Sequence, residues 1–299
     1  YAYFTAQYKA QANTEFLIVI KVGNPSEYAN AIPQEHLHYN YSSTWTDQLI
    51  SYGEIAYLNG VSQPELSLQE YLYDKQGNPI EITNFVYNGT TYEYAILNWS
   101  GRELTKVYLM SSDGFPVYQI EYSYNDQGYR IKEEVSTFNG FRFVINQTKK
   151  YELIGDQVIY ETDGNYQILY TYDYDGKLIS FNYDNDVNDQ IKGIEYFYLY
   201  NQMGDVTHLV TSQSEVVVHY VYDGFGLIIK TEVAIGYQEV ADVNPYRYRG
   251  YRYDVSTNLY YLNSRYYNPE VGRFINADGL LGIFGEIQSY NMYAYCANN

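Results

Sequence analysis

The sequence Tyr71-Leu-Tyr-Asp-Lys-Gln-Gly77 is one copy of a repeat in which Tyr-x-Tyr-(Asp/Asn)-x-x-Gly precedes an apolar residue. An internal repeat of this kind sets the architecture of the whole chain. Further full copies start at four tyrosines: Tyr122, Tyr170, Tyr198 and Tyr220. Looser copies occupy three short segments: Asn98–Gly101, Ser111–Gly114 and Glu161–Gly164. The repeat is therefore the main structural signal of the chain.

Each copy has the chemistry of a β-hairpin. Tyrosines two residues apart point to the same face of a strand. The Asp or Asn that follows bonds to backbone N–H groups ahead of it and starts a turn. Glycine then adopts the positive φ that other residues resist, and the apolar residue opens the returning strand. The sequence therefore predicts a series of antiparallel hairpins.

A series of hairpins must pair side by side, because a single hairpin is barely stable in water. A long meander also has to curl or close in order to protect its edge strands. We therefore expect an all-β fold in which one sheet of hairpins curls into a spiral or closes into a barrel. The Tyr-x-Tyr-Asp signature resembles the YD repeat, and this resemblance implies part of a hollow shell made from one spiralling β-sheet. An ordinary sandwich or propeller with tyrosine-rich strands is the alternative. A short helix near Thr46–Tyr52 and a buried strand at Phe16–Ile20 are also predicted.

The composition supports a folded β protein. The 299 residues include 42 tyrosines, a residue that suits half-buried strands. A net charge of −18 is opposite to the footprint of a nucleic-acid-binding protein. No run of 18 apolar residues exists that would span a membrane. With a single cysteine, Cys296, no intrachain disulfide is expected, and a buried apolar role is favoured over a reactive thiol.

The last residues, Tyr246 to Asn299, have a distinct sequence. Tyr246-Arg-Tyr-Arg-Gly-Tyr251 alternates tyrosine with arginine, and a hairpin-like turn at Asp254–Asn258 leads into Leu259-Tyr-Tyr-Leu262. Arg265-Tyr-Tyr-Asn-Pro-Glu-Val-Gly-Arg-Phe274 follows. This segment resembles the core segment that ends the shell of bacterial YD-repeat, or Rhs (rearrangement hotspot), proteins of the polymorphic-toxin type. We call residues 246–299 the core segment.

The resemblance implies a domain order and a function. Residues 1–65 are expected to be a divergent β segment that continues an upstream shell, residues 66–245 the YD-repeat array, and residues 246–299 the core segment that closes it. The implied function is structural encapsulation of a C-terminal toxin that this chain does not contain. The implied partners are that toxin and the upstream shell, and the implied location is secreted or at the bacterial cell surface.

The resemblance also implies a candidate catalytic site. In self-cleaving members of the family, an arginine and an aspartate of the core segment work with a second aspartate. The matching residues are Arg265 and Asp278. Asn268 stands where the family often has aspartate, and Gly279 replaces a proline after Asp278. The second aspartate would lie beyond Asn299, so this fragment is not expected to be an enzyme by itself. An ion pair that pins the closing strand is the alternative role.

Other candidates have weaker signals. His36 and His38 would share a strand face, but no third metal ligand has suitable spacing, so no metal or cofactor is expected. The glycines Gly279, Gly282 and Gly285 lack the lysine of a phosphate-binding loop. Tyrosine walls can stack on sugars, so a glycan-binding surface adhesin remains an alternative function. Cross-strand tyrosine ladders explain the same residues without a ligand.

Overall fold

A computed structural model describes residues 3–5, 19–21, 35–58, 61–62, 66–187, 192–279 and 291–295. Two short N-terminal strands, β1 (Tyr3–Thr5) and β2 (Val19–Lys21), pair with each other. The next strands in the chain are β3 (Glu35–Tyr41), β4 (Leu49–Leu58), β5 (Val61–Ser62), β6 (Leu66–Tyr73), β7 (Pro79–Tyr87), β8 (Thr90–Ser100), β9 (Glu103–Met110), β10 (Pro116–Tyr124) and β11 (Arg130–Phe138). They are followed by β12 (Phe143–Ile154), β13 (Gln157–Thr162), β14 (Gln167–Tyr172), β15 (Leu178–Asp184), β16 (Ile194–Tyr200), β17 (Val206–Thr211), β18 (Val216–Tyr222) and β19 (Ile228–Val233).

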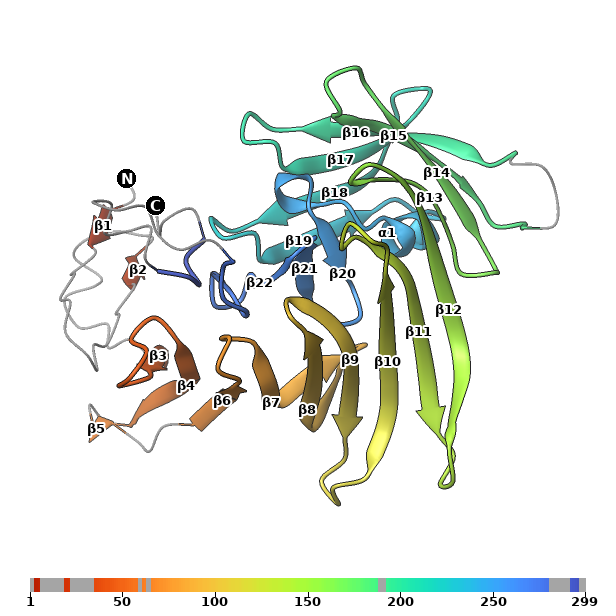
Figure 1. Ribbon diagram of the computed structural model, residues 1–299. Coiled ribbons are helices and arrows are strands. Elements are labelled where there is room, and N and C mark those ends of the chain that lie inside the picture. The colour runs from red at the N-terminus through yellow and green to blue at the C-terminus, as the bar shows by residue number, and fades with distance from the viewer. Residues whose placement is uncertain are drawn as a thin grey trace.

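One antiparallel meander accounts for most of the molecule. From β6 to β19 each strand pairs with the next strand of the chain, and β4 joins β3 to the same sheet by pairing with β6. The sheet curves strongly, so that its strands form a wall around the core segment (Figure 1). The predicted all-β fold with a curled sheet of hairpins is confirmed. The helix predicted near Thr46–Tyr52 is wrong, because β4 begins at Leu49 and pairing with β3 and β6 outweighs a weak local preference.

The core segment lies on the concave side of this wall (Figure 1). A short helix α1 (Gln238–Val243) precedes it, and a single 3₁₀ turn at Tyr248–Gly250 lies near its start. Its strands are β20 (Arg252–Asp254), β21 (Leu259–Leu262), β22 (Arg265–Asn268) and β23 (Arg273–Phe274), which form a separate antiparallel sheet. The turn predicted at Asp254–Asn258 is confirmed between β20 and β21. Of the strand predicted at Phe16–Ile20, residues 16–18 lie outside the described part of the chain.

The full repeats fold into identical turns. In the first copy, the side-chain Oδ1 of Asp74 accepts hydrogen bonds from the N–H groups of Gln76 at 2.8 Å and Asn78 at 2.9 Å. The same pair of bonds forms at the other four copies: Asn125, Asp173, Asn201 and Asp223. The glycine of each copy has φ between 81° and 87°. The predicted turn chemistry is therefore confirmed in all five copies.

Every full repeat turn lies at one end of the sheet. Successive antiparallel strands alternate in direction, so every second turn of a meander falls at the same end. The five full copies join β6 to β7, β10 to β11, β14 to β15, β16 to β17 and β18 to β19. The looser copy at Asn98–Gly101 is at this end too, whereas Ser111–Gly114 and Glu161–Gly164 lie at the opposite end. We call the first end the repeat-turn end.

The second tyrosine of each copy links neighbouring hairpins, and we call this contact the latch. Its hydroxyl donates to a carbonyl at the start of the preceding strand in the sheet. The bonds run from Tyr73 to Leu49 (2.8 Å), Tyr124 to Leu104 (2.7 Å), Tyr172 to Val158 (2.8 Å), Tyr200 to Leu178 (2.6 Å) and Tyr222 to Val206 (2.7 Å). In the looser copy, the indole N–H of Trp99 donates to the Pro79 carbonyl at 2.6 Å. The Tyr-Asp pair of the repeat thus encodes both a turn and an inter-hairpin bond.

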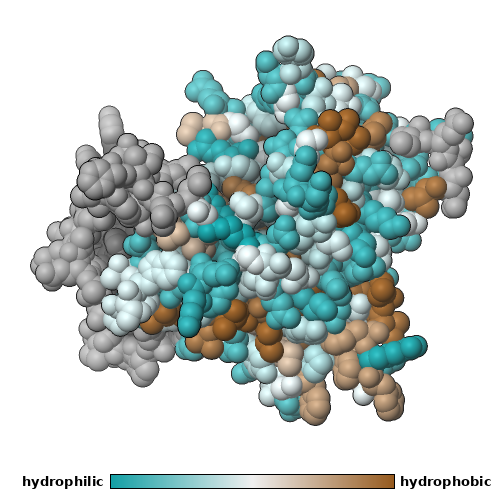
Figure 2. Space-filling model, viewed as in Figure 1, coloured by the Kyte–Doolittle hydropathy of each residue, from teal (hydrophilic) through white to brown (hydrophobic). Residues whose placement is uncertain are grey.

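The two faces of the sheet differ in polarity. The first tyrosine of each copy is buried on the inner face, with at most 5% of its surface exposed. Together with aliphatic residues these tyrosines form two clusters, one over β4 to β11 and one over β12 to β18. Outward-facing apolar residues such as Leu72 and Leu199 are exposed. On the face seen in Figure 2, brown apolar patches lie among polar residues. The core segment therefore packs against an apolar, tyrosine-rich wall.

Candidate functional site

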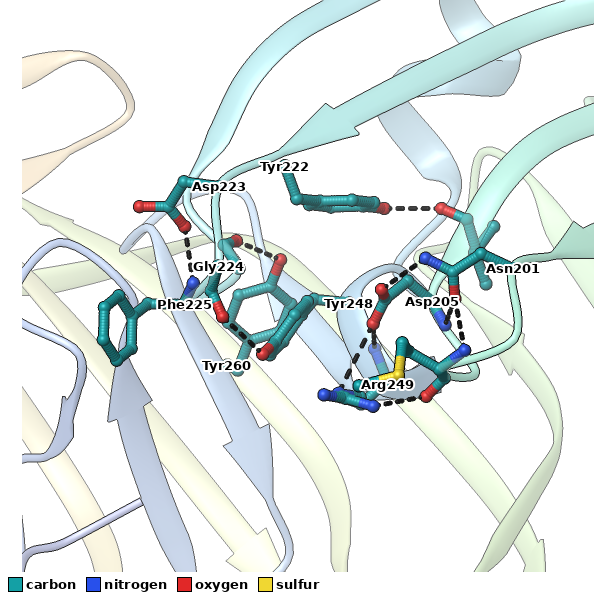
Figure 3. A network of polar contacts seen from close by, with 12 residues as sticks. Asn201, Asp205, Tyr222, Asp223, Gly224, Phe225, Tyr248, Arg249 and Tyr260 are labelled. Carbon is teal, nitrogen blue, oxygen red and sulfur yellow. Dashed lines mark hydrogen bonds and ion pairs between the residues drawn. The ribbon is translucent and has the colours of Figure 1, made fainter. Parts of the chain in front are cut away.

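The last repeat turn, residues 223–227, is bound by three tyrosines of the core segment, two of which, Tyr248 and Tyr260, are labelled in Figure 3. Their hydroxyls donate to consecutive backbone carbonyls: Tyr248 to Gly224 (3.1 Å), Tyr267 to Phe225 (2.6 Å) and Tyr260 to Gly226 (2.9 Å). A Cβ at Gly226 would lie 2.5 Å from the ring of Tyr248. The glycine thus serves the turn and also allows a close approach of the core segment.

The turn before it, residues 201–205, is held by Arg249 (Figure 3). The backbone N–H of Arg249 donates to Asp205 Oδ1 at 3.0 Å, and its guanidinium donates to the Met203 carbonyl at 2.6 Å. Arg249 has a φ of 54°, a left-handed conformation that is costly for a non-glycine residue. The two bonds to the turn compensate for this strain.

The first repeat turn, residues 74–78, is bound by a different part of the core segment. The Tyr293 hydroxyl and the Ala277 N–H donate to the Gly77 carbonyl at 3.0 and 3.1 Å. Arg273 continues the contact to the β3–β4 hairpin, where it donates to the Tyr41 hydroxyl at 2.8 Å and to the Asp47 carbonyl. The core segment therefore contacts the first and the last full repeat turns, which are far apart in the sequence. We call this set of contacts the clasp.

Between these ends, a buried ion pair and a cation–π contact fix the core segment to the middle of the wall. Arg252 of β20 donates to Glu161 of β13 at 2.7 Å, and Glu161 is 3% exposed. Arg130 of β11 lies 3.5 Å from Glu133 and 4.2 Å from the ring centre of Tyr261. Unpaired charges are seldom buried because desolvation is costly. These contacts therefore specify where the core segment can dock.

Glu133 belongs to a crowded set of charges around a cavity of about 70 Å³. Burial raises the pKa of the Glu133 carboxyl, and the nearby Asp254 carboxylate raises it further. Lys149, Arg130 and Arg252 act in the opposite direction. Shell and core residues thus share one electrostatic environment.

The structure brings the two predicted site residues together. Arg265 Nη1 lies 2.8 Å from Asp278 Oδ2, and both side chains are partly exposed. The Arg265 guanidinium also lies over the Phe274 ring at 3.6 Å. Burial lowers the pKa of Arg265, and the Asp278 carboxylate partly offsets this effect. The contact holds the loop after β23 to the start of β22.

A shell residue that the sequence did not single out completes this corner. Arg102, in the β8–β9 turn, donates to the backbone carbonyls of Ala277 at 2.7 Å and Asp278 at 2.6 Å. A Cβ at Gly279 would lie 2.7 Å from the Arg102 guanidinium carbon. The glycine that departs from the family pattern therefore makes room for Arg102.

The remaining sequence candidates lie elsewhere. His36 and His38 are both in β3, and Asn268 ends β22 with its side chain buried. Cys296, Gly282 and Gly285 fall outside the described residues. Within the described ranges, no group of three or more His, Cys, Asp or Glu side chains is arranged to hold a metal ion. No helix of the described residues is long and apolar enough to cross a membrane.

The fold and the clasp define a repeat protein whose last segment closes its own curled sheet. The chain is 34% identical over 231 residues to the tRNA3(Ser)-specific nuclease WapA of Bacillus spizizenii and 34% identical over 229 residues to the tRNA nuclease WapA of Bacillus subtilis. Each match covers 76% of this chain and 8% of the relative. The chain belongs to the YD-repeat, or Rhs, proteins of the polymorphic-toxin type.

Solved structures share the fold. A chain of the TcdB2-TccC3-Cdc42 crystal structure matches 99% of this chain with a TM-score of 0.53 and 18% identity, over 16% of its own length. A chain of TcdB2-TccC3-TEV matches 90% with the same TM-score and 16% identity, over 17% of its length. No protein-family model matches the sequence.

Proposed function

We propose that this chain is the closing part of a shell in a secreted bacterial toxin, and that it encloses a C-terminal effector lying outside residues 1–299. The observation that carries the proposal is the clasp: one segment binds both the first and the last full repeat turns. A wall tied at both places excludes proteases and target molecules from its interior. The domain order 1–65, 66–245 and 246–299 and the secreted or cell-surface location are parts of the same proposal.

The first test uses a natural polypeptide that carries this shell together with its effector. We expect limited proteolysis to spare the effector while the shell is intact. Opening the clasp by Gly77→Ala should expose the effector to cleavage, and Gly114→Ala, at the opposite end of the sheet, should leave it protected. Equal cleavage of the effector in the parent and in both variants would overturn encapsulation.

A second candidate function, self-cleavage that releases the effector, is favoured by the Arg265–Asp278 contact. An arginine in contact with one carboxylate is a feature of the self-cleaving site that the resemblance implies, where that carboxylate works with a second one. The contact between Arg265 and Asp278 is also what a purely structural ion pair would show. Asp278 is partly exposed, so its replacement should cost less than about 1 kcal/mol of stability.

We expect Asp278→Asn to abolish processing of the longer polypeptide on a denaturing gel. Asp113→Asn, which alters an exposed turn aspartate, should leave processing unchanged. If the Asp278→Asn protein is cleaved at the parental rate, Asp278 is structural and self-cleavage through this pair is excluded.

A further inference from the structure

The chain of latches is interrupted once. Residue 153, at the end of β12, occupies the place held by Tyr124 at the end of β10 and Tyr172 at the end of β14, but it is a leucine. The strand pairing supports this equivalence: Glu121 pairs with Lys106, three residues before Tyr124, as Lys150 pairs with Lys132, three residues before Leu153. A leucine has no donor, so β12 sends no latch to the start of β11, where the Arg130 N–H instead donates to the Tyr261 hydroxyl of the core segment at 3.3 Å.

A cavity of about 310 Å³ lies at this interruption. Leu153 and Arg130 both line it, together with tyrosines from the wall and the core segment: Tyr129, Tyr151, Tyr172, Tyr246, Tyr251 and Tyr261. Two exposed residues, Asp156 and Asn263, also line it. An apolar cavity of about 150 Å³ is large enough to bind benzene. The available space therefore admits an aromatic ring with room for a polar group.

The molecule itself indicates the chemistry of the ligand. At six equivalent places an aromatic ring fills the corner between two hairpins and donates one hydrogen bond to a strand-end carbonyl. Five of these donors are phenols. Near the cavity, Arg130 faces Glu133 and Arg252 faces Glu161, but Arg130 Nε and Arg252 Nη1 are buried without a hydrogen-bond partner among the described residues. A phenol suits this place because its hydroxyl can donate to a carbonyl while its oxygen accepts from such an N–H group.

We propose that the cavity at Leu153 is a binding site for a phenol, either a free small molecule or the tyrosine side chain of a bound polypeptide. The ring packs against Leu153 and the surrounding tyrosines, and the hydroxyl donates to the Arg130 carbonyl. The site is independent of encapsulation and of self-cleavage.

The test uses p-cresol, the isolated tyrosine side chain, with toluene as the ligand without a hydroxyl. We expect p-cresol to bind the protein about 2- to 10-fold more tightly than toluene, the factor that one net hydrogen bond gives. NMR chemical-shift perturbation of residues near Arg130 and Leu153 would show that p-cresol binds in this cavity. The peptides Gly-Tyr-Gly and Gly-Phe-Gly distinguish a side-chain ligand from a free phenol.

Filling the cavity from within provides the control. Leu153→Tyr should add the missing latch, raise the melting temperature by about 2–4 °C and abolish p-cresol binding. Leu153→Phe should also block p-cresol binding, with a smaller gain in melting temperature. This variant is the control if Leu153→Tyr fails to fold. The proposal is overturned if toluene binds as tightly as p-cresol, or if p-cresol binds a folded Leu153 variant as tightly as the parent.

Discussion

Arg252→Met is expected to destabilise the protein by about 3–5 kcal/mol, because it leaves Glu161 buried without its cation. Glu161 is 3% exposed, and its carboxylate lies 2.7 Å from the Arg252 guanidinium. The same guanidinium lies 4.9 Å from the ring centre of Tyr151, so aromatic contact is lost as well. Denaturant unfolding monitored by tyrosine fluorescence measures the change.

The matched control is Lys132→Met on the outer face of the sheet. Lys132 lies 2.9 Å from Glu134, and both side chains are partly exposed. Exposed pairs contribute about 0–1 kcal/mol because water screens them. If the two variants lose similar amounts of stability, the buried pair does not anchor the core segment.

Gly77→Ala is expected to cost about 2–5 kcal/mol and to detach the core segment from the first repeat turn. A Cβ at this position would lie 2.5 Å from the Tyr293 hydroxyl and 2.7 Å from the Ala277 Cβ. The clash adds about 1–3 kcal/mol to the cost of placing alanine at a φ of 82°. Thermal unfolding reports the stability, and hydrogen exchange at Ala277 reports the detachment.

Gly114→Ala separates the steric clash with the core segment from the backbone cost of alanine at a positive φ. Gly114 has a φ of 75°, but a Cβ at this position would have no neighbouring atom within 4 Å, so alanine there meets only the backbone cost. We expect the loss to be about 1–2 kcal/mol, with no change in exchange at Ala277. Equal losses at Gly77 and Gly114 would show that the contact of the core segment with the first turn contributes nothing.

The repeat could be read from the sequence because its chemistry is local. An Asx turn needs only an Asp or Asn side chain and the N–H groups just beyond it, as at Asp74. Each full copy could therefore be recognised from its own residues. The ends of the sheet were not distinguished, since a pattern such as Ser111–Gly114 resembles a repeat turn but belongs to the other end. The resemblance named Arg265 and Asp278 as candidate catalytic residues, an ion pair was the alternative role, and the two side chains lie in contact.

The clasp and the buried pairs could not be predicted in the same way. Arg252 and Glu161 are 91 residues apart, and the local sequence around either residue does not indicate that the two form an ion pair. Arg102 directly follows a looser copy of the repeat, and in the sequence it resembles any surface arginine. The interruption at Leu153 was detectable in principle, because Tyr151 is followed two residues later by leucine instead of tyrosine. Its structural consequence, a missing hydrogen bond between hairpins, follows only from the six latches of the folded sheet.

The central claim is that the core segment holds the first and last repeat turns together. Spin labels at Lys75→Cys and Gly224→Cys, in a Cys296→Ser background, place one probe on each turn. We expect a single narrow distance distribution in the parent and in Gly114→Ala, and a broad one in Gly77→Ala. A distribution in Gly77→Ala as narrow as in the parent would contradict the account, since the sheet would then keep its closure without the clasp.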